Sequence, residues 1–354
     1  MERLIPTSAN GTIPNLYFIG RWVPKKLANR SVMYTTNLGA QVTFEVQNAA
    51  SVSLEWILPD LAIPQTVTIF VDDQPRLIEL NEPRFEIQLS SKSRHVVHLY
   101  FTGNTDQDEV WTSSAGLALA DVHPSVGGQM HAVKPAGPLV AWIGDSITAG
   151  CWVREKVPSR GYGADLNYAA LVSRKLNWED YRVAYSAAGI IRYGTGGVPA
   201  APRFINYVDY ETPAPDFQPK FVFVNLGTND WQFDTPVFEM YFTAFMKEVQ
   251  FKFNEAQIFV MIPLNQSHAK TIKAIAQTFN FTVIPTATWK YSTTDEVHPD
   301  VAGSQVLSRQ LLDWLQIHGW VWSELALLRF NPIPVKPLKI EKTGDKRLKK
   351  ANGK

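Results

Sequence analysis

The stretch PLVAWIGDSITAG, residues 138–150, joins a short apolar run to a sharp polar break. Residues 139–143 are continuously apolar, as a strand buried on both faces of a parallel sheet requires, and Gly144, Asp145 and Ser146 follow at once. Similar runs recur later in the chain, with stretches of helix-like apolar spacing between them. The runs are residues 182–185, 221–226, 258–262 and 282–284, and the helical stretches are residues 165–176, 237–253 and 299–317. Strands that alternate with helices predict a parallel α/β sheet with helices on both faces.

A different pattern fills the chain before residue 135, where apolar residues alternate with a period of two, as in half-buried strands. The alternating residues include Val42, Phe44 and Val46, then Val52, Leu54 and Trp56, then Phe85, Ile87 and Leu89, and later Val97 and Leu99. Turn-forming residues 72–75 separate two strand-like runs. This pattern predicts an all-β sandwich of jelly-roll type. The periodicity is lost in HAVKPAG, residues 131–137, so we predict a β-sandwich domain over residues 1–135 and an α/β domain over residues 136–330.

The last segment, residues 331–354, differs in composition from both predicted domains. From Lys336 onward it holds eight Lys or Arg residues against two acidic ones, and few apolar residues. Such a composition is typical of disordered chain. We expect a solvated basic tail; weak attachment to an anionic polymer is the alternative, and we expect no nucleic-acid partner.

The composition also excludes several classes of protein. A single cysteine, Cys151, excludes an internal disulfide and a Cys-rich zinc site. There is no run of about 18 apolar residues, so we expect no membrane insertion. The first residues lack the basic and then apolar pattern of a secretory signal, which makes a cytoplasmic location the expectation. The sequence implies no metal or organic cofactor, and it predicts no particular oligomeric state.

Ser146 is a candidate nucleophile because it directly follows a predicted strand, and α/β sheets carry their reactive groups at the carboxyl ends of strands. Taken alone, Gly-Asp-Ser also fits a turn followed by a helix cap. Asp295 and His298 form an Asp-x-x-His sequence before Pro299, which is well placed to begin a helix. This spacing lets the carboxylate reach one imidazole nitrogen while the other nitrogen faces the serine. His298 would then take the Ser146 proton and return it to the leaving alcohol.

A further predicted strand ends in NLGTND, residues 225–230, where the Asn229 amide is a candidate donor to a developing oxyanion. Taken alone, Asn229 and Asp230 also fit the caps of a turn. The blocks at residues 143–150, 225–230 and 295–298, in this order, resemble the signature blocks of the SGNH (GDSL-type) hydrolases. The resemblance implies a three-layer, flavodoxin-like catalytic domain with a Ser146–His298–Asp295 triad. It also implies an oxyanion hole formed by Ser146, Gly189 and Asn229, with Gly189 in the segment YSAAGI.

A β-sandwich ahead of an SGNH domain is similar to carbohydrate esterase family 2, whose members remove acetyl groups from sugar hydroxyls. In the first domain this resemblance rests on FIGRW (residues 18–22), QVTFEV (residues 41–46) and RHVVHLYF (residues 94–101). It implies an acetylated carbohydrate, or another small ester, as the substrate. Trp152, Trp231 and Trp289 lie close in sequence to the three blocks and are candidate contacts for a sugar ring. Each of these tryptophans also fits packing in the core or between the domains.

These observations together predict a serine esterase that removes short O-acyl groups, in the first place acetyl, from a carbohydrate. The same residues fit a lipid or thioester hydrolase with a long apolar channel, or an acetyltransferase in which an alcohol replaces water. A carbohydrate-binding module with weak esterase activity is the alternative from another class, but its catalytic blocks would be eroded. An α/β-hydrolase is disfavoured, because Thr148 stands where Gly-x-Ser-x-Gly requires glycine.

Overall fold

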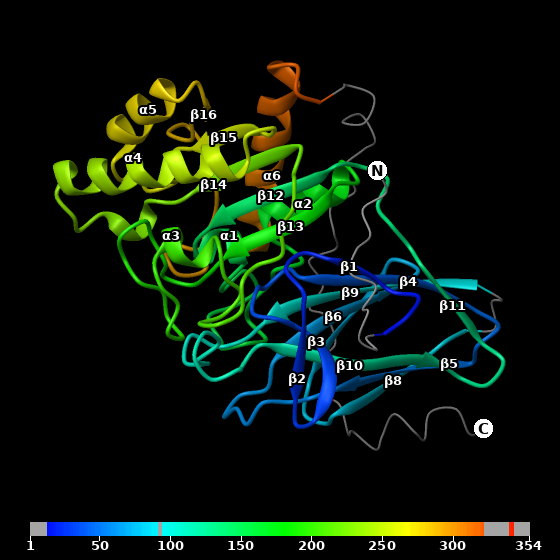
Figure 1. Ribbon diagram of the computed structural model, residues 1–354. Coiled ribbons are helices and arrows are strands. Elements are labelled where there is room, and N and C mark those ends of the chain that lie inside the picture. The colour runs from blue at the N-terminus through cyan, green and yellow to red at the C-terminus, as the bar shows by residue number, and fades with distance from the viewer. Residues whose placement is uncertain (1–12, 91–93, 322–339, 343–354) are drawn as a thin grey trace.

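The computed structural model of the protein describes residues 13–90, 94–321 and 340–342. Two sheets with mainly antiparallel strands and one parallel sheet form two adjoining regions (Figure 1). The strands of the first region are β1 (Tyr17–Ile19), β2 (Val23–Leu27), β3 (Arg30–Thr35), β4 (Gln41–Gln47), β5 (Ser51–Trp56), β6 (Thr66–Val71), β7 (Gln74–Glu79), β8 (Arg84–Gln88), β9 (Arg94–Gly103), β10 (Leu117–Pro124) and β11 (Gln129–Ala132). The second region contains β12 (Leu139–Gly144), α1 (Ser146–Ala149), α2 (Tyr168–Lys175), β13 (Glu179–Ala184), α3 (Ala201–Phe204), β14 (Phe221–Asn225), the 3-10 helix η1 (Thr228–Asp230), α4 (Thr235–Lys252), β15 (Gln257–Met261), α5 (Ala269–Thr278), β16 (Thr282–Ile284) and α6 (Val301–Ile317).

The first region is a β-sandwich with jelly-roll connectivity. One sheet contains β3-β10-β5-β8 and the other β4-β9-β6-β7, in these spatial orders, so that strands β3 to β10 alternate between the sheets except at the β6–β7 hairpin. Val42, Phe44 and Val46 of β4 are at most 1% exposed, because they point between the sheets. Asp72 and Asp73 form the two-residue hairpin turn with φ of 49° and 64°. The predicted alternation and its turn are thus confirmed.

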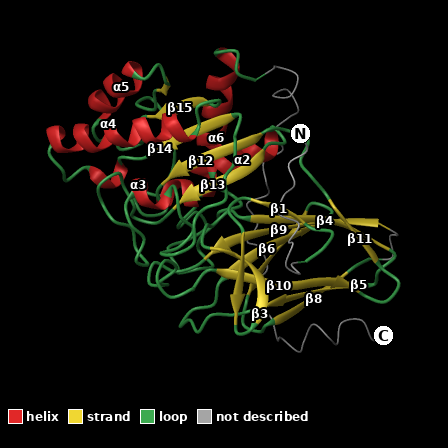
Figure 2. Cartoon of the chain, viewed as in Figure 1, coloured by secondary structure: helices red, strands yellow, loops and turns green. Residues whose placement is uncertain are grey.

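The second region is a five-stranded parallel sheet with the order β13-β12-β14-β15-β16. Helices α3, α4 and α5 pack on one face of the sheet, and α2 and α6 pack on the other (Figure 2). This confirms the predicted three-layer α/β class. In this flavodoxin-like order the direction of the chain across the sheet reverses between β12 and β14, which end side by side at Gly144 and Asn225. Open α/β sheets bind ligands at such a point.

Some predicted boundaries are wrong by a few residues. Helix α2 begins at Tyr168 instead of residue 165, because the side chain of Asn167 accepts the N–H of Ala170 and caps the helix there. Strand β13 begins at Glu179, three residues before the predicted run. Helix α5 is absent from the predicted set; its N-cap residue, His268, makes no side-chain capping bond, so the usual start signal is missing.

The predicted basic tail falls mostly outside the described residues. Its residues 340–342 form strand β17 (Ile340–Lys342), which pairs in parallel with β7 at the edge of the sandwich. The prediction of disorder is therefore wrong for these three residues. Edge strands offer unpaired backbone groups to any extended segment, and composition alone does not reveal such a pairing.

The sandwich packs directly against strand β13, the edge of the parallel sheet. The Tyr17 hydroxyl of β1 donates to Glu179 Oε1 at 2.6 Å. Arg182 and Asp180 of β13 form a buried ion pair, and Gly39 of the sandwich lies so close that a Cβ there would be 2.5 Å from Arg182 Cζ. The two regions therefore share a buried polar interface. Within the described residues, no helix is long and apolar enough to cross a membrane.

Candidate functional site

Ser146 lies at the sharp turn between β12 and α1, where it is 6% exposed. The turn is built by its neighbours: Asp145 Oδ1 accepts the N–H of Ile147 at 3.0 Å, and Gly150 ends the helix with φ of 90°. At Gly150 a side chain would also meet the backbone of Ala164 at 2.7 Å, so only glycine fits. As the first residue of a helix, Ser146 has an N–H group without a partner inside the helix.

His298 and Asp295 are brought to Ser146 by the loop between β16 and α6. His298 Nε2 lies 2.8 Å from Ser146 Oγ, and His298 Nδ1 lies 2.9 and 3.0 Å from the two carboxylate oxygens of Asp295. The loop is held as a tight turn, since Thr293 and Pro299 form a bridge and Glu296 adopts φ of 72°. The structure thus brings together the three predicted triad residues in one hydrogen-bonded chain.

The environment of Asp295 favours its charged form. Partial burial alone would raise the pKa of this carboxyl, but it accepts hydrogen bonds from the backbone N–H and imidazole of His298 and from the N–H of Val297. Together these bonds lower the pKa of Asp295 below its ordinary value. The carboxylate can therefore fix the imidazole with Nδ1 protonated and leave Nε2 free to accept the serine proton.

Asn229 sits in η1, just beyond the end of β14. Gly227, just before η1, adopts φ of 119°, a conformation that suits glycine. The Asn229 Nδ2 group donates one hydrogen bond to the Ala188 carbonyl at 3.0 Å. An amide nitrogen carries two hydrogens, so one donor remains for a substrate oxygen. This placement is compatible with the predicted donor role.

Gly189 does not fit the role that was predicted for it. Its N–H donates to the carbonyl of Arg192 at 2.9 Å, so the group is not available to an oxyanion in this structure. A Cβ at this position would lie 2.4 Å from Asp230 Oδ1. The glycine is therefore required by close packing against a carboxylate, and sequence alone gives both uses the same signal.

Asp230 is a residue whose importance the sequence did not reveal. It is fully buried and accepts the N–H groups of Ile190 at 2.8 Å, Ile191 at 3.0 Å and Arg192 at 3.1 Å. In the sequence it fits a turn cap equally well. In the structure its carboxylate ties η1, which carries Asn229, to the loop after β13.

The three candidate tryptophans have different surroundings. Trp231 follows Asp230 directly and is 67% exposed. Trp152 is half-buried against the sandwich core, with its ring edge-on to Tyr162 at 4.8 Å between centroids. Trp289 is half-buried and packs on the face of the sheet that α2 and α6 cover. Trp231 is the most exposed of the three.

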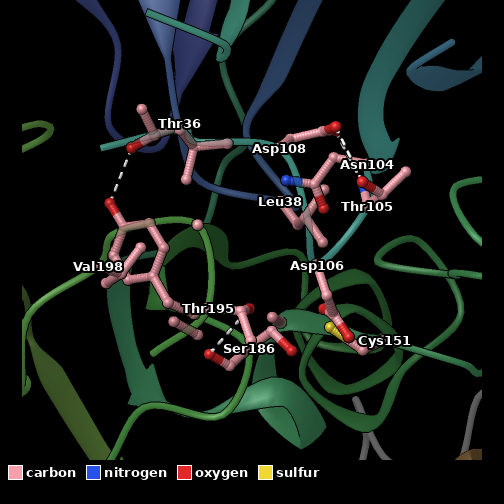
Figure 3. A pocket seen from close by; sticks show the side chains of 15 residues that line it. Thr36, Leu38, Asn104, Thr105, Asp106, Asp108, Cys151, Ser186, Thr195 and Val198 are labelled. Atoms are coloured by element: carbon pink, nitrogen blue, oxygen red, sulfur yellow. Dashed lines mark hydrogen bonds between the residues drawn. The ribbon is translucent and has the colours of Figure 1, made fainter. Parts of the chain in front are cut away.

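A pocket lies between the sandwich and the second region (Figure 3). Its lining includes Asp106 and Asp108 from the sandwich and Cys151 and Ser186 from the second region. Cys151 is buried, and burial raises the pKa of its thiol well above its usual range. No group of three or more His, Cys, Asp or Glu side chains within the described part of the chain could hold a metal ion.

Comparison with known families assigns the second region. Residues 142–306 match the GDSL-like lipase/acylhydrolase family. Over these residues the second region is therefore similar to this family. Its match spans all three predicted blocks, and it confirms the expected class of enzyme, a carboxylic ester hydrolase. A search of curated proteins found no match.

Solved structures share the fold of both regions of this hydrolase. One is a family two carbohydrate esterase from Clostridium thermocellum in complex with cellohexaose, which is 19% identical with a TM-score of 0.68. The match covers 86% of this chain and 100% of the esterase chain. The acetyl xylan esterase Est2A from Butyrivibrio proteoclasticus is 16% identical with a TM-score of 0.67, covering 87% and 97%. The salicylyl-acyltransferase SsfX3 of a tetracycline biosynthetic pathway is 11% identical with a TM-score of 0.61, covering 86% and 96%. The predicted arrangement of a sandwich ahead of a hydrolase domain is therefore one that carbohydrate esterases of family two also have.

Proposed function

We propose that the protein is a serine esterase that removes short O-acyl groups, in particular acetyl, from a carbohydrate. The observation that carries this proposal is the continuous hydrogen-bonded chain Asp295–His298–Ser146 at the switch point of the sheet. The choice of a carbohydrate is supported by the shared fold with family two carbohydrate esterases and by the exposed Trp231, which follows η1 directly.

In the proposed reaction, Ser146 Oγ attacks the ester carbonyl carbon while His298 Nε2 takes its proton. The oxyanion forms hydrogen bonds with the Ser146 N–H and the Asn229 amide, and Asp295 stabilises the imidazolium. His298 then protonates the sugar oxygen as the bond to the carbonyl carbon breaks, which leaves an acetyl group on Ser146. Water, deprotonated by His298, attacks this ester and releases acetate, and the proton returns to Ser146.

The test measures acetate released from acetylated oligosaccharides, together with hydrolysis of p-nitrophenyl acetate and p-nitrophenyl octanoate. We expect turnover that favours acetyl over octanoyl and that is lost in Ser146→Ala, whereas Ser113→Ala, at an exposed serine of the sandwich, keeps it. Preference for octanoyl would indicate a lipid-type hydrolase instead. Faster loss of the acetyl ester on addition of a sugar acceptor, with sugar ester formed, would indicate transfer.

Unchanged hydrolysis in Ser146→Ala would overturn the proposal, because the catalytic assignment depends on this side chain. Binding of oligosaccharides with no ester turnover by the wild type would favour a binding module. We further propose that the boundary between the two domains lies near residue 135, between the end of β11 at Ala132 and the start of β12 at Leu139.

A further inference from the structure

Two buried aspartates flank the turn that carries Ser146, and their hydrogen-bond partners differ. Both Asp145 and Asp230 are 0% exposed. Asp230 accepts three backbone N–H groups. Asp145 accepts the N–H of Ile147 on Oδ1, whereas its Oδ2 is buried without a hydrogen-bond partner in the part of the chain that the structure describes. A buried carboxylate oxygen without a donor is costly, so Asp145 is the less well stabilised of the two charges.

The Thr228 hydroxyl is the neighbour that can complete Asp145. Thr228 opens η1, and its Oγ1 is also buried and without a partner that meets hydrogen-bond geometry among the described residues. It faces the Asp145 carboxyl and acts on it as a hydrogen-bonding group. This proximity follows from the sheet, because Gly144 and Asn225 are paired at the ends of β12 and β14. A shared proton between Asp145 and Thr228 would satisfy both atoms at once.

The charges around Asp145 oppose its ionisation. Burial raises the pKa of Asp145 to about 7, the bond from Ile147 and the nearby Thr228 hydroxyl lower it, and the charge of Asp230 raises it further. The other titratable groups near it are the neutral Tyr168 hydroxyl on α2 and the buried Cys151 thiol after α1. His298 faces the same turn through Ser146. No cation among these neighbours compensates a charge on Asp145 in the resting site.

We propose that Asp145 is a positioning residue that works in its protonated form, capping α1 through Oδ1 and donating from Oδ2 to Thr228. This inference rests on the proposed function. The O–H···O bond ties the nucleophile turn to the turn that carries Asn229, so both groups that meet the substrate oxygen keep their spacing. When Asp145 loses its proton, a negative charge next to Ser146 opposes the oxyanion that forms there. The neutral acid therefore supports the reaction, and its ionisation slows the reaction.

The experiment measures the rate of Ser146 labelling by a fluorophosphonate and the kcat for p-nitrophenyl acetate, each as a function of pH. We expect the wild-type rates to decline above about pH 7, by about tenfold per pH unit, as Asp145 ionises. Asp145→Asn carries a neutral amide that can accept from Ile147 and donate to Thr228. Its rates at about pH 8 and about pH 9 should be nearly equal, whereas the wild-type rates should fall by about tenfold between these two pH values.

A second pair of variants tests the contact from the other side. Thr228→Val removes the hydroxyl, so the ionised form of Asp145 loses a donor and the alkaline decline should move to higher pH while kcat falls more than KM changes. Thr228→Ser restores the hydroxyl and should restore the wild-type profile. This pair remains informative even if Asp145→Asn does not fold.

The outcomes separate the inference from the proposed function. Parallel pH profiles in wild type and Asp145→Asn, or no shift in Thr228→Val, would overturn the role of Asp145 and leave the esterase proposal intact. A wild type that is neither labelled nor active at any pH would overturn the proposed function itself.

Discussion

Replacing Asp230 tests how the turn that carries Asn229 is held. In Asp230→Asn one carboxylate oxygen becomes an amide donor. The remaining oxygen can keep the N–H groups of Ile191 and Arg192, which share Oδ1, but the N–H of Ile190 then faces another donor. In Asp230→Ala all three N–H groups lose their acceptor in a site that is fully buried.

The expected loss of stability follows from the number of hydrogen bonds that each variant loses. A hydrogen bond to a charged group contributes about 1.5–3 kcal/mol, and an unsatisfied buried donor costs about 1–3 kcal/mol. We therefore expect Asp230→Asn to lower the free energy of unfolding by about 2–3 kcal/mol and Asp230→Ala by about 3–5 kcal/mol, since water can reach part of the emptied site. Both should lower kcat more than they raise KM, because the loosened turn misplaces Asn229.

Urea unfolding followed by tryptophan fluorescence, and hydrolysis of p-nitrophenyl acetate, measure the two effects. Asp234→Asn is the matched control: Asp234 precedes α4, is exposed and makes no capping bond, so its free energy of unfolding should stay within about 0.5 kcal/mol of wild type. The reasoning is refuted if the Asp230 variants are as stable and as active as this control.

Three further results are expected. Asp295→Asn should lower kcat/KM for p-nitrophenyl acetate by about a thousand- to ten-thousand-fold, because the amide no longer fixes the tautomer of His298. Gly189→Ala should lower the free energy of unfolding in urea by about 1–3 kcal/mol, because its Cβ would lie 2.4 Å from the Asp230 carboxylate. The melting temperature, measured against pH, should reveal that the pKa of Asp145 is raised to about 7. Between about pH 4 and pH 7 the folded state holds this proton and the unfolded state does not. The free energy of unfolding therefore falls as pH rises through this window. The wild type should lose stability relative to Asp145→Asn across that window, by on the order of a few kcal/mol; equal pH dependence of the two proteins would contradict this.

The parts of the site that were predictable are those that depend on local spacing and on strand ends. Ser146 follows a continuous apolar run, and such a run ends at the edge of a parallel sheet where side chains are accessible. Asp295 and His298 are three residues apart, so a single tight turn brings the carboxylate to the imidazole. Neither step requires knowledge of distant packing.

The parts that were not predictable depend on contacts between segments far apart in the chain. Asp230 and the N–H groups of residues 190–192 are about forty residues apart, and only the folded loop after β13 brings them together. The same loop uses the N–H of Gly189, which a sequence pattern treats as free. Contacts between distant segments also determine which tryptophans are exposed. Trp152 packs on the sandwich core, whereas Trp231 does not.

The central claim, that Ser146 carries the acyl group, is tested most directly by trapping the intermediate. The wild type is mixed with p-nitrophenyl acetate, quenched in acid within the first turnover, digested and analysed by mass spectrometry, alongside Ser146→Ala. We expect one acetyl group on the peptide that contains residues 138–150, located at Ser146, and none in the variant. Acetyl found on another residue, or turnover that persists in Ser146→Ala without this adduct, would contradict the account.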